Sequence, residues 1–456
     1  MIFEVLAMKI IDKTSILIIF LVFSNFLFGT ISVFAVPLLR MPGNSILIIV
    51  FLRFVGGGII MLFLVFIQLL LKKYHDNKNG ENYSFFQTNW SDLKHYLTSK
   101  NARFFNLHRL LYLFLLGFFG ITVNVVTYFI GLEELSIVLM LVGSPGGTII
   151  VIAFYNSKNK EKLTLFKGVY LFMMFFALVI TFLATENTLS VKATITGILA
   201  LFVNIVALFI LFVYMGRDSY ARVEKIWQKK QGGNYTLMRT LVKLAIFMLF
   251  GGVSVLLLLP FGYIFPGSYF TELANGFLEQ FAHIWLLLFN PNMIVLILCN
   301  TVLAYLLLFV PATFWDVEHS LSLDQWNSIL YLLDPITGTT LSVALGYETA
   351  NIPLLATTLV LLAIAILLRY VHEKESRFSA IIFIDVTFGS QKAMLQHLST
   401  FPEIRKYYWT TGISDMMIKA NFGSINEYYS FITQLGIKKE IKIKFDLSSF
   451  VKKCHL

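Results

Sequence analysis

Two charged residues interrupt long apolar stretches of this sequence and are its strongest candidates for chemistry. Arg53 lies in IVFLRFVGGGIIMLF, and Asp334 lies in LYLLDPITGTTLSV. A charge at membrane depth costs about 2.5–3.5 kcal/mol or more, so it usually faces protein or water. Arg53 is a candidate for binding an anionic substrate group or for pairing with Asp334. The alternative is a structural pair, or a side chain that extends to the membrane surface.

Asp334 has two interpretations of its own. A carboxyl group removed from water favours its neutral form, which suits a residue that exchanges protons. The alternative is a carboxylate that is satisfied by backbone amides at a break in a helix. We expect the functional role, because Asp334 directly precedes Pro335 near the middle of its apolar run.

Two prolines occupy the middle of apolar runs, one in each half of the chain. They are Pro335 and Pro145, the latter in LVGSPGGTIIVIAFY. A proline inside a helix removes a backbone hydrogen bond and bends the helix. In lipid, such a defect is tolerated where protein or a wet cavity satisfies the freed groups. A pair of defects in corresponding positions predicts a substrate path between two repeats, with the prolines shaping the helices more than touching the ligand.

Five further polar residues lie in apolar stretches and complete the candidate pathway. Each has a simpler interpretation as an interhelical hydrogen-bonding group, because a polar side chain in hydrocarbon needs a partner. They are Asn25, Asn124, Tyr128, Asn300 and Tyr305.

Composition places the chain among polytopic membrane proteins. Of 456 residues, 57% are hydrophobic and only 14% are charged, against about half and about a quarter in soluble domains. The net charge of +10 does not indicate nucleic-acid binding, because Lys and Arg lie in short segments between apolar runs. The sequence has no nucleotide-binding, hydrolase or metalloprotease motif. Its two cysteines, Cys299 and Cys454, lack metal-site spacing. We therefore expect neither an enzyme nor a cofactor.

Ten stretches have the length of about 20 residues that a membrane helix needs. The bias of Lys and Arg between loops predicts that both termini are cytoplasmic in a cell membrane. Five stretches in each half give the halves opposite orientations, as in inverted-repeat transporters. Residues 265–290 are predicted to form an interfacial amphipathic helix, and residues 72–109 form a long polar loop. The stretches are 15–39, 46–71, 111–130, 135–154, 165–183, 193–215, 241–264, 292–312, 326–345 and 353–370.

The composition changes after residue 377. Strand patterns at 378–387, 405–411, 415–421 and 437–445 are interleaved with helix patterns at 390–398 and 424–435. The order βαββαβ predicts a small α+β domain. The even number of preceding spans places this domain in the cytoplasm.

Residues 15–370 resemble the EamA-type drug/metabolite transporters. The resemblance rests on FLFGTISVFAVPLLR, FLRFVGGGI, TYFIGLEELSIVLMLVGSPGGTIIVIAFY and LYLLDPITGTTLSVALGYE. It implies ten helices in two inverted five-helix repeats, here residues 15–184 and 192–370. The family usually has Glu before the second proline, where this chain has Asp334. The long 72–109 loop and the 265–290 insertion also depart from the family's compact pattern.

Residues 378–456 resemble the ligand-binding domain of Lrp/AsnC regulators. The βαββαβ order and the segment TTGISDMMIKANF carry the likeness, with Gly412 and Asp415 at the family's glycine and aspartate positions. The residues alone predict a tight turn there. The resemblance implies homo-oligomerisation, an amino-acid effector bound at the interfaces, and a prokaryotic source.

These features predict a secondary transporter, and more specifically an exporter, of a small organic metabolite such as an amino acid. It would work by alternating access, with the cytoplasmic domain pairing subunits or sensing an amino acid. A membrane-anchored sensor that uses the same scaffold without transport is the alternative. The expected partners are the substrate, the lipid bilayer and a second copy of the chain, and no nucleic acid.

Overall fold

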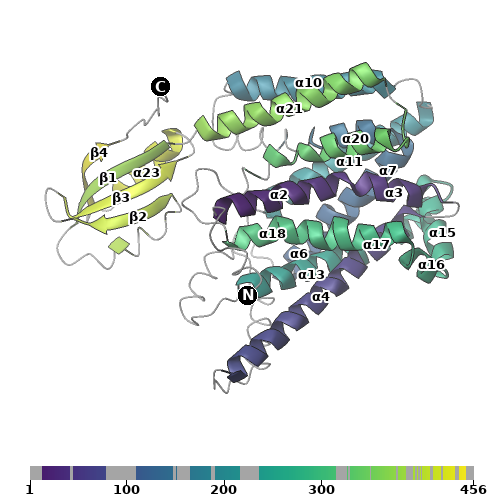
Figure 1. The fold of residues 1–456 in the computed structure, drawn as a ribbon, viewed down its shortest axis with the longest axis horizontal. Helices are drawn as coiled ribbons and strands as arrows, with labels where there is room; N and C mark the ends of the chain where they lie inside the picture. Colours follow the sequence, from purple (N-terminus) through teal and green to yellow (C-terminus); the bar gives the residue numbers. More distant parts are fainter. Residues whose placement is uncertain are drawn as a thin grey trace.

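A computed structural model gives the architecture of the chain (Figure 1). The 72–109 loop lies largely outside the residues that it describes, as does Gly412. The described residues are 13–41, 45–78, 109–146, 150, 165–185, 191–215, 236–314, 326, 329–349, 351–375, 378–386, 394–395, 398, 401, 403–410, 414–422, 425–436 and 441–447.

Six helical segments are long and apolar enough to cross a membrane, so the chain has the features of a multi-pass membrane protein. Two shorter apolar helices, Gly168–Thr181 and Ile195–Leu211, accompany them. The ten expected spans and their arrangement as a repeat remain predictions. The six segments are Ile16–Leu39, Ile46–Gln68, Leu110–Glu134, Leu241–Ile264, Pro291–Phe309 and Ile352–Val371.

Several of these segments consist of shorter helices that follow one another. Two of them contain a π-helical turn, η1 and η4, in which hydrogen bonds reach one residue further than in an α-helix. The helical elements are α2 (Lys13–Gly29), α3 (Ile31–Leu39), α4 (Ile46–Lys78), α6 (Arg109–Gly117), η1 (Phe118–Val123), α7 (Asn124–Glu134), α8 (Ile137–Gly143), α10 (Leu165–Thr185), α11 (Val191–Met215), α13 (Thr236–Ser254), the 3₁₀ turn η3 (Val255–Leu258), α14 (Leu259–Ile264), α15 (Tyr269–Phe281), α16 (Ile284–Leu288), α17 (Pro291–Ile297), η4 (Leu298–Leu303), α18 (Ala304–Phe314), α20 (Leu333–Ala344) and α21 (Ile352–Glu375).

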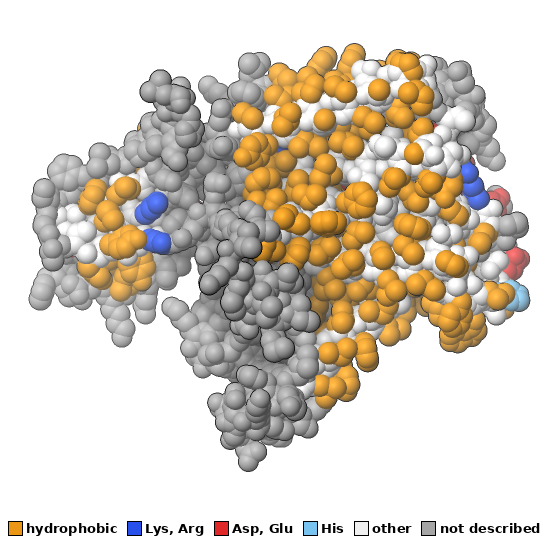
Figure 2. Space-filling model, in the orientation of Figure 1, with side chains coloured by type: hydrophobic (Ala, Val, Ile, Leu, Met, Phe, Trp, Pro, Cys, Tyr) orange, Lys and Arg blue, Asp and Glu red, His pale blue; other side chains and the backbone are white. Residues whose placement is uncertain are grey.

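The helices pack in pairs that join the two halves of the chain. Helix α4 packs along α13, α10 along α21, α7 along α11, and α2 along α18. Helix α20 contacts α2 and α8. Close approaches need small residues: a Cβ added to Gly252 of α13 would lie 2.8 Å from the backbone nitrogen of Val55 in α4. Hydrophobic side chains are spread over the face of the bundle that Figure 2 shows, as expected where lipid is the solvent.

The two prolines lie at helix ends and not inside continuous helices, which corrects the expectation of two mid-helix bends. Pro145 is in a turn directly after α8, and Pro335 is the third residue of α20, after a turn at Tyr331 and Leu332. The first four N–H groups of a helix have no partner within the helix, so a proline there removes no bond.

The C-terminal domain contains a four-stranded antiparallel sheet in the order β2-β3-β1-β4. Its strands are β1 (Phe378–Val386), β2 (Ile404–Trp409), β3 (Met416–Phe422) and β4 (Ile441–Leu447), and α23 (Ile425–Gly436) precedes β4. Helical residues between β1 and β2 include Met394 and Leu398. One hydrophobic core joins these residues to β1, β2, β3 and α23.

Candidate functional site

Arg53 is held inside the bundle by the π-helical turn of the neighbouring segment. Its side chain is 2% exposed. Nε donates to Oγ1 of Thr301 at 2.7 Å, and Nη2 donates to the Asn300 carbonyl at 3.2 Å. Both acceptors belong to η4, where the π-helical turn makes the Asn300 carbonyl available. Gly57, one turn along α4, allows the close approach of Thr301, whose Cγ2 would lie 3.0 Å from an added Cβ.

Asp334 lies in the first turn of α20 and interacts electrostatically with Arg53. Its Oδ1 is enclosed and accepts no hydrogen bond from the residues that the structure describes. The junction of α2 and α3, at Gly29 and Thr30, lies beside it. A Cβ on Gly29 would lie 2.7 Å from the Asp334 carbonyl oxygen and 3.2 Å from Oδ1. Only glycine therefore allows this junction to lie against the carboxyl group.

Three tyrosines interact electrostatically with Arg53 or Asp334. Arg53 interacts electrostatically with Tyr128 and Tyr305, and Asp334 interacts with Tyr128 and Tyr331. The ring of Tyr305 lies 5.1 Å, centroid to centroid, from the ring of Phe28. The structure thus brings together four of the predicted pathway residues, Arg53, Tyr128, Tyr305 and Asp334. It adds Tyr331, a polar side chain three residues before the aspartate in LYLLDP, which the sequence-based prediction missed.

Asn300 belongs to the same region through the other side of η4. Its Nδ2 donates to Oγ1 of Thr30 at 2.7 Å and to the Leu27 carbonyl. Its Oδ1 is enclosed without a hydrogen bond from the described residues. Asn25, in contrast, donates to the Leu21 carbonyl of its own helix at 2.8 Å. Asn300 therefore fixes the junction of α2 and α3, whereas the Asn25 side chain bonds a carbonyl one turn earlier in its own helix.

Asn124 and Pro145 belong to a second polar cluster. Nδ2 of Asn204 donates to Oδ1 of Asn124 at 2.7 Å and to its carbonyl at 2.8 Å, and Ser144 donates to Oδ1 of Asn204 at 3.1 Å. The cluster ties α7, α11 and the turn at Pro145 together. The sequence-based prediction missed Asn204, although it interrupts the apolar stretch GILALFVNIVALFIL as the other candidates interrupt theirs.

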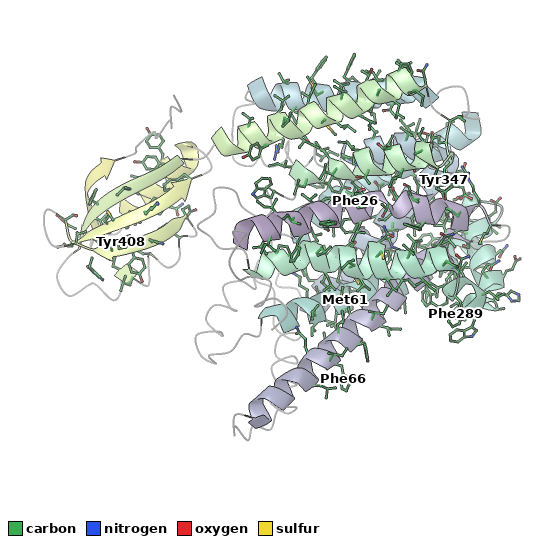
Figure 3. The ribbon with its side chains drawn as sticks, viewed as in Figure 1. Phe26, Met61, Phe66, Phe289, Tyr347 and Tyr408 are labelled. Carbon is green, nitrogen blue, oxygen red and sulfur yellow. The ribbon has the colours of Figure 1, made fainter. Side chains whose placement is uncertain are left out.

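Glu348 closes one end of the bundle. Its Oε2 accepts a hydrogen bond from the Val138 N–H at 3.0 Å, at the start of α8. Next to it, Arg40 donates to the Tyr347 carbonyl at 2.8 Å, so this loop also contacts the end of α3 (Figure 3). Burial raises the pKa of Glu348, although the Val138 N–H, Ser136 and Arg40 all favour the charged form.

In the C-terminal domain, Asp415 is exposed and lies in the turn before β3. Its N–H donates to the Ile384 carbonyl at 3.1 Å, and its carbonyl accepts from the Thr410 N–H at 3.0 Å. Thr410 Oγ1 also donates to the Ser414 carbonyl at 2.5 Å. These bonds lie on both sides of residues 411–413, which are outside the described residues, as is most of the predicted turn. A ligand contact at Asp415 stays a prediction.

Comparison with known proteins identifies the C-terminal domain. The family model described as "Lrp/AsnC ligand binding domain" matches residues 379–443, whereas no EamA-type model matches the helical part. No curated protein matches the chain. A solved structure described as "Crystal structure of protein" aligns with a TM-score of 0.45 and 14% identity, over 79% of this chain and 98% of that one. The chain thus joins a multi-pass membrane part to an Lrp/AsnC ligand-binding domain.

Proposed function

We propose that the protein is a secondary transporter that moves a small organic metabolite by alternating access. The observation that carries this proposal is that two ionisable side chains lie among the helices: Arg53 is buried, and Oδ1 of Asp334 is enclosed without a hydrogen bond from the described residues. An intramembrane charge is usually retained for a substrate or proton path. A dipolar solute could replace the interaction of Arg53 with Asp334 by two interactions of its own.

Several contacts support the inverted five-helix repeats that the EamA resemblance implies. The two π-helical turns, η1 and η4, fall in the third expected helix of each half. Each carries a threonine that contacts a glycine-rich turn of the other half. Thr122 donates to the Gly251 carbonyl at 2.6 Å, and Thr301 lies against Gly57. In such a repeat, α4 and α13 would be the second helix of each half, and α10 and α21 would be the fifth. Each of these two packed pairs would then consist of equivalent helices.

Flux into proteoliposomes tests the proposal. The purified chain is reconstituted with a panel of radiolabelled amino acids and other small metabolites, and uptake is compared with Arg53→Ala, Asp334→Asn and Glu272→Gln. Glu272 is an exposed acid outside the candidate site, so that variant is the control. We expect flux of one solute class that both site variants lower by at least tenfold and the control leaves unchanged. Absence of flux for every solute, with all proteins folded, would reject transport.

The C-terminal domain favours a second candidate, a membrane-anchored amino-acid sensor. The Lrp/AsnC match suggests binding of an amino-acid effector and oligomerisation. A ligand shifts an equilibrium only through a difference in affinity between two states. Calorimetric titration of the full-length chain with each amino acid, repeated with Asp415→Ala, tests this role. Binding that is lost in the variant while flux is absent would favour the sensor over the transporter.

A further inference from the structure

A helical hairpin connects two membrane helices at one end of the bundle (Figure 1). It consists of α15 and α16, and it follows α14, which ends at Ile264. The membrane-spanning segment Leu241–Ile264 ends directly before the hairpin, and the segment Pro291–Phe309 begins directly after it. The hairpin therefore begins and ends at the depth where two membrane helices leave the apolar layer.

One side of the hairpin is fixed to the bundle. Leu273 and Phe277 of α15 are buried, and the Phe277 ring lies 5.8 Å from the ring of Phe51 in α4. Ser45 Oγ donates to the Leu273 carbonyl at 2.8 Å. A Cβ on Gly276 would lie 3.1 Å from the Cβ of Ser45. These contacts hold α15 across the start of α4 in a fixed position, so its remaining surface has a defined direction.

The remaining surface is sharply divided between apolar and polar residues. Glu272, Asn275 and Glu279 are exposed and recur at a spacing of three and four, so they form one face of α15. Exposed apolar residues flank the buried side of α15 and continue onto α16 and the residue after it. These are Phe270, Leu278, Phe281, Trp285, Leu286 and Phe289, of which the last three are 66%, 77% and 70% exposed.

We propose that this hairpin is embedded in the interfacial layer of the bilayer, with Trp285, Leu286 and Phe289 among the lipid acyl chains. Removing large apolar side chains from water is favourable, and Trp is enriched at this depth of the membrane. Large apolar side chains are also exposed at the end of α14, where Ile264 is 62% and Phe265 is 54% exposed. Glu272 and Glu279 then face the water.

The chemistry of the hairpin specifies how it binds lipid. Residues 265–290 contain no Lys or Arg and one histidine, His283. Many interfacial helices use basic residues to bind anionic headgroups, but this segment has none to offer. Its attachment is therefore apolar, and it should be the same in neutral and in anionic membranes and at low and high salt. The acyl chains, and not the headgroups, are the partner.

Site-directed spin labelling tests this depth directly. Leu286→Cys and Glu279→Cys are each made in the full-length chain with Cys299→Ser and Cys454→Ser, labelled with a nitroxide, and reconstituted into phosphatidylcholine vesicles. Power saturation then measures collision with oxygen, which dissolves in lipid, and with a nickel chelate, which stays in water. We expect the label at 286 to collide mainly with oxygen and the label at 279 to collide mainly with the nickel chelate. Neither result should change when phosphatidylglycerol is added to the vesicles.

Two outcomes would overturn the proposal. Nickel access at 286 equal to that at 279 would place the side chain in water. Protection at 286 from both reagents would mean that protein covers it, such as a second copy or another subunit. A second measurement needs no label. Brominated lipid quenches the fluorescence of tryptophans that lie among acyl chains, so the quenched fraction should fall when Trp285→Phe removes one of the chain's six tryptophans. An unchanged quenched fraction would also reject the proposal.

Discussion

Oε2 of Glu348 lies 3.0 Å from the backbone nitrogen of Val138, so a carboxylate from the loop after α20 satisfies an N–H group at the start of α8. These helices belong to different halves of the chain. The contact is local in space but 210 residues apart in sequence, which makes it a link between the halves at one end of the bundle. A second link beside it, from Arg40 to the Tyr347 carbonyl at 2.8 Å, joins the same loop to α3.

The Glu348 link should make stability depend on pH. Because burial raises the pKa of Glu348, the folded protein binds this proton more tightly than the unfolded chain does. Stability then falls as pH rises from the ordinary glutamate pKa through the raised value. Glu348→Gln keeps an oxygen acceptor for Val138 and removes the titration. As the pH rises from 4 to 8, the melting temperature of the wild type in detergent should fall relative to that of this variant. Parallel curves would contradict the assignment, and Glu272→Gln is the control.

Gly29→Ala should damage the candidate site by steric means. The added methyl group would lie 2.7 Å from the Asp334 carbonyl oxygen, which is backbone and cannot swing away. Overpacking of this kind costs about 1–3 kcal/mol. Gly56→Ala is the matched control, since its methyl group would meet only the flexible Ile297 side chain, at 3.2 Å. Thermal melting in detergent should show a clear loss for the first variant and a smaller one for the second.

Asn204 and Asn124 should behave as one unit. Their side chains are joined by a hydrogen bond of 2.7 Å, and Asn204 also bonds the Asn124 carbonyl. Hydrogen bonds between membrane helices contribute about 0.6 kcal/mol each, and up to about 1.7 kcal/mol. Asn204→Leu and Asn124→Leu should each lower the melting temperature, and the double variant should lose less than their sum. Full additivity would show that the two residues act separately.

The sequence was sufficient to predict the broad organisation because hydrophobicity and alternation are local signals. The strands β1 and β3 were predicted to within one residue at each end, and the insertion at 265–290 was expected to be helical and amphipathic. The same reasoning could not place the start of α20. Residues 329–333 form a continuous apolar run, ILYLL, so they carry no periodicity that would mark a turn at Tyr331 and Leu332.

The π-helical turns were also beyond sequence reasoning. Their position depends on which helix lies opposite, here Gly57 of α4 facing Thr301 and Gly251 of α13 facing Thr122. Packing between distant segments therefore decides the geometry that presents the Asn300 carbonyl to Arg53. The candidate residues Arg53 and Asp334 could be chosen from the sequence because a charge in lipid is rare. The sequence suggested that Arg53 could pair with Asp334, but it could not show that the two residues lie in the same region of the fold.

Thr301 should contribute to stability through Arg53 and not only through its own helix. Its Oγ1 accepts from Arg53 Nε at 2.7 Å and donates to the Leu296 carbonyl at 2.8 Å. Thr301→Val keeps the shape but leaves a buried guanidinium N–H without its acceptor, which costs about 1–3 kcal/mol. The matched control is Thr340→Val, whose exposed hydroxyl donates only to Ile336 of its own helix at 2.7 Å.

Melting in detergent, measured for both threonine variants and for Thr301→Ser, gives the comparison. We expect a marked loss for Thr301→Val, recovery in Thr301→Ser, and little change for Thr340→Val. In an Arg53→Ala background, the further effect of Thr301→Val should shrink, because the N–H that it leaves unpaired is gone. An equal effect in both backgrounds would mean that Thr301 stabilises η4 alone, and that Arg53 is held in the bundle by its other contacts.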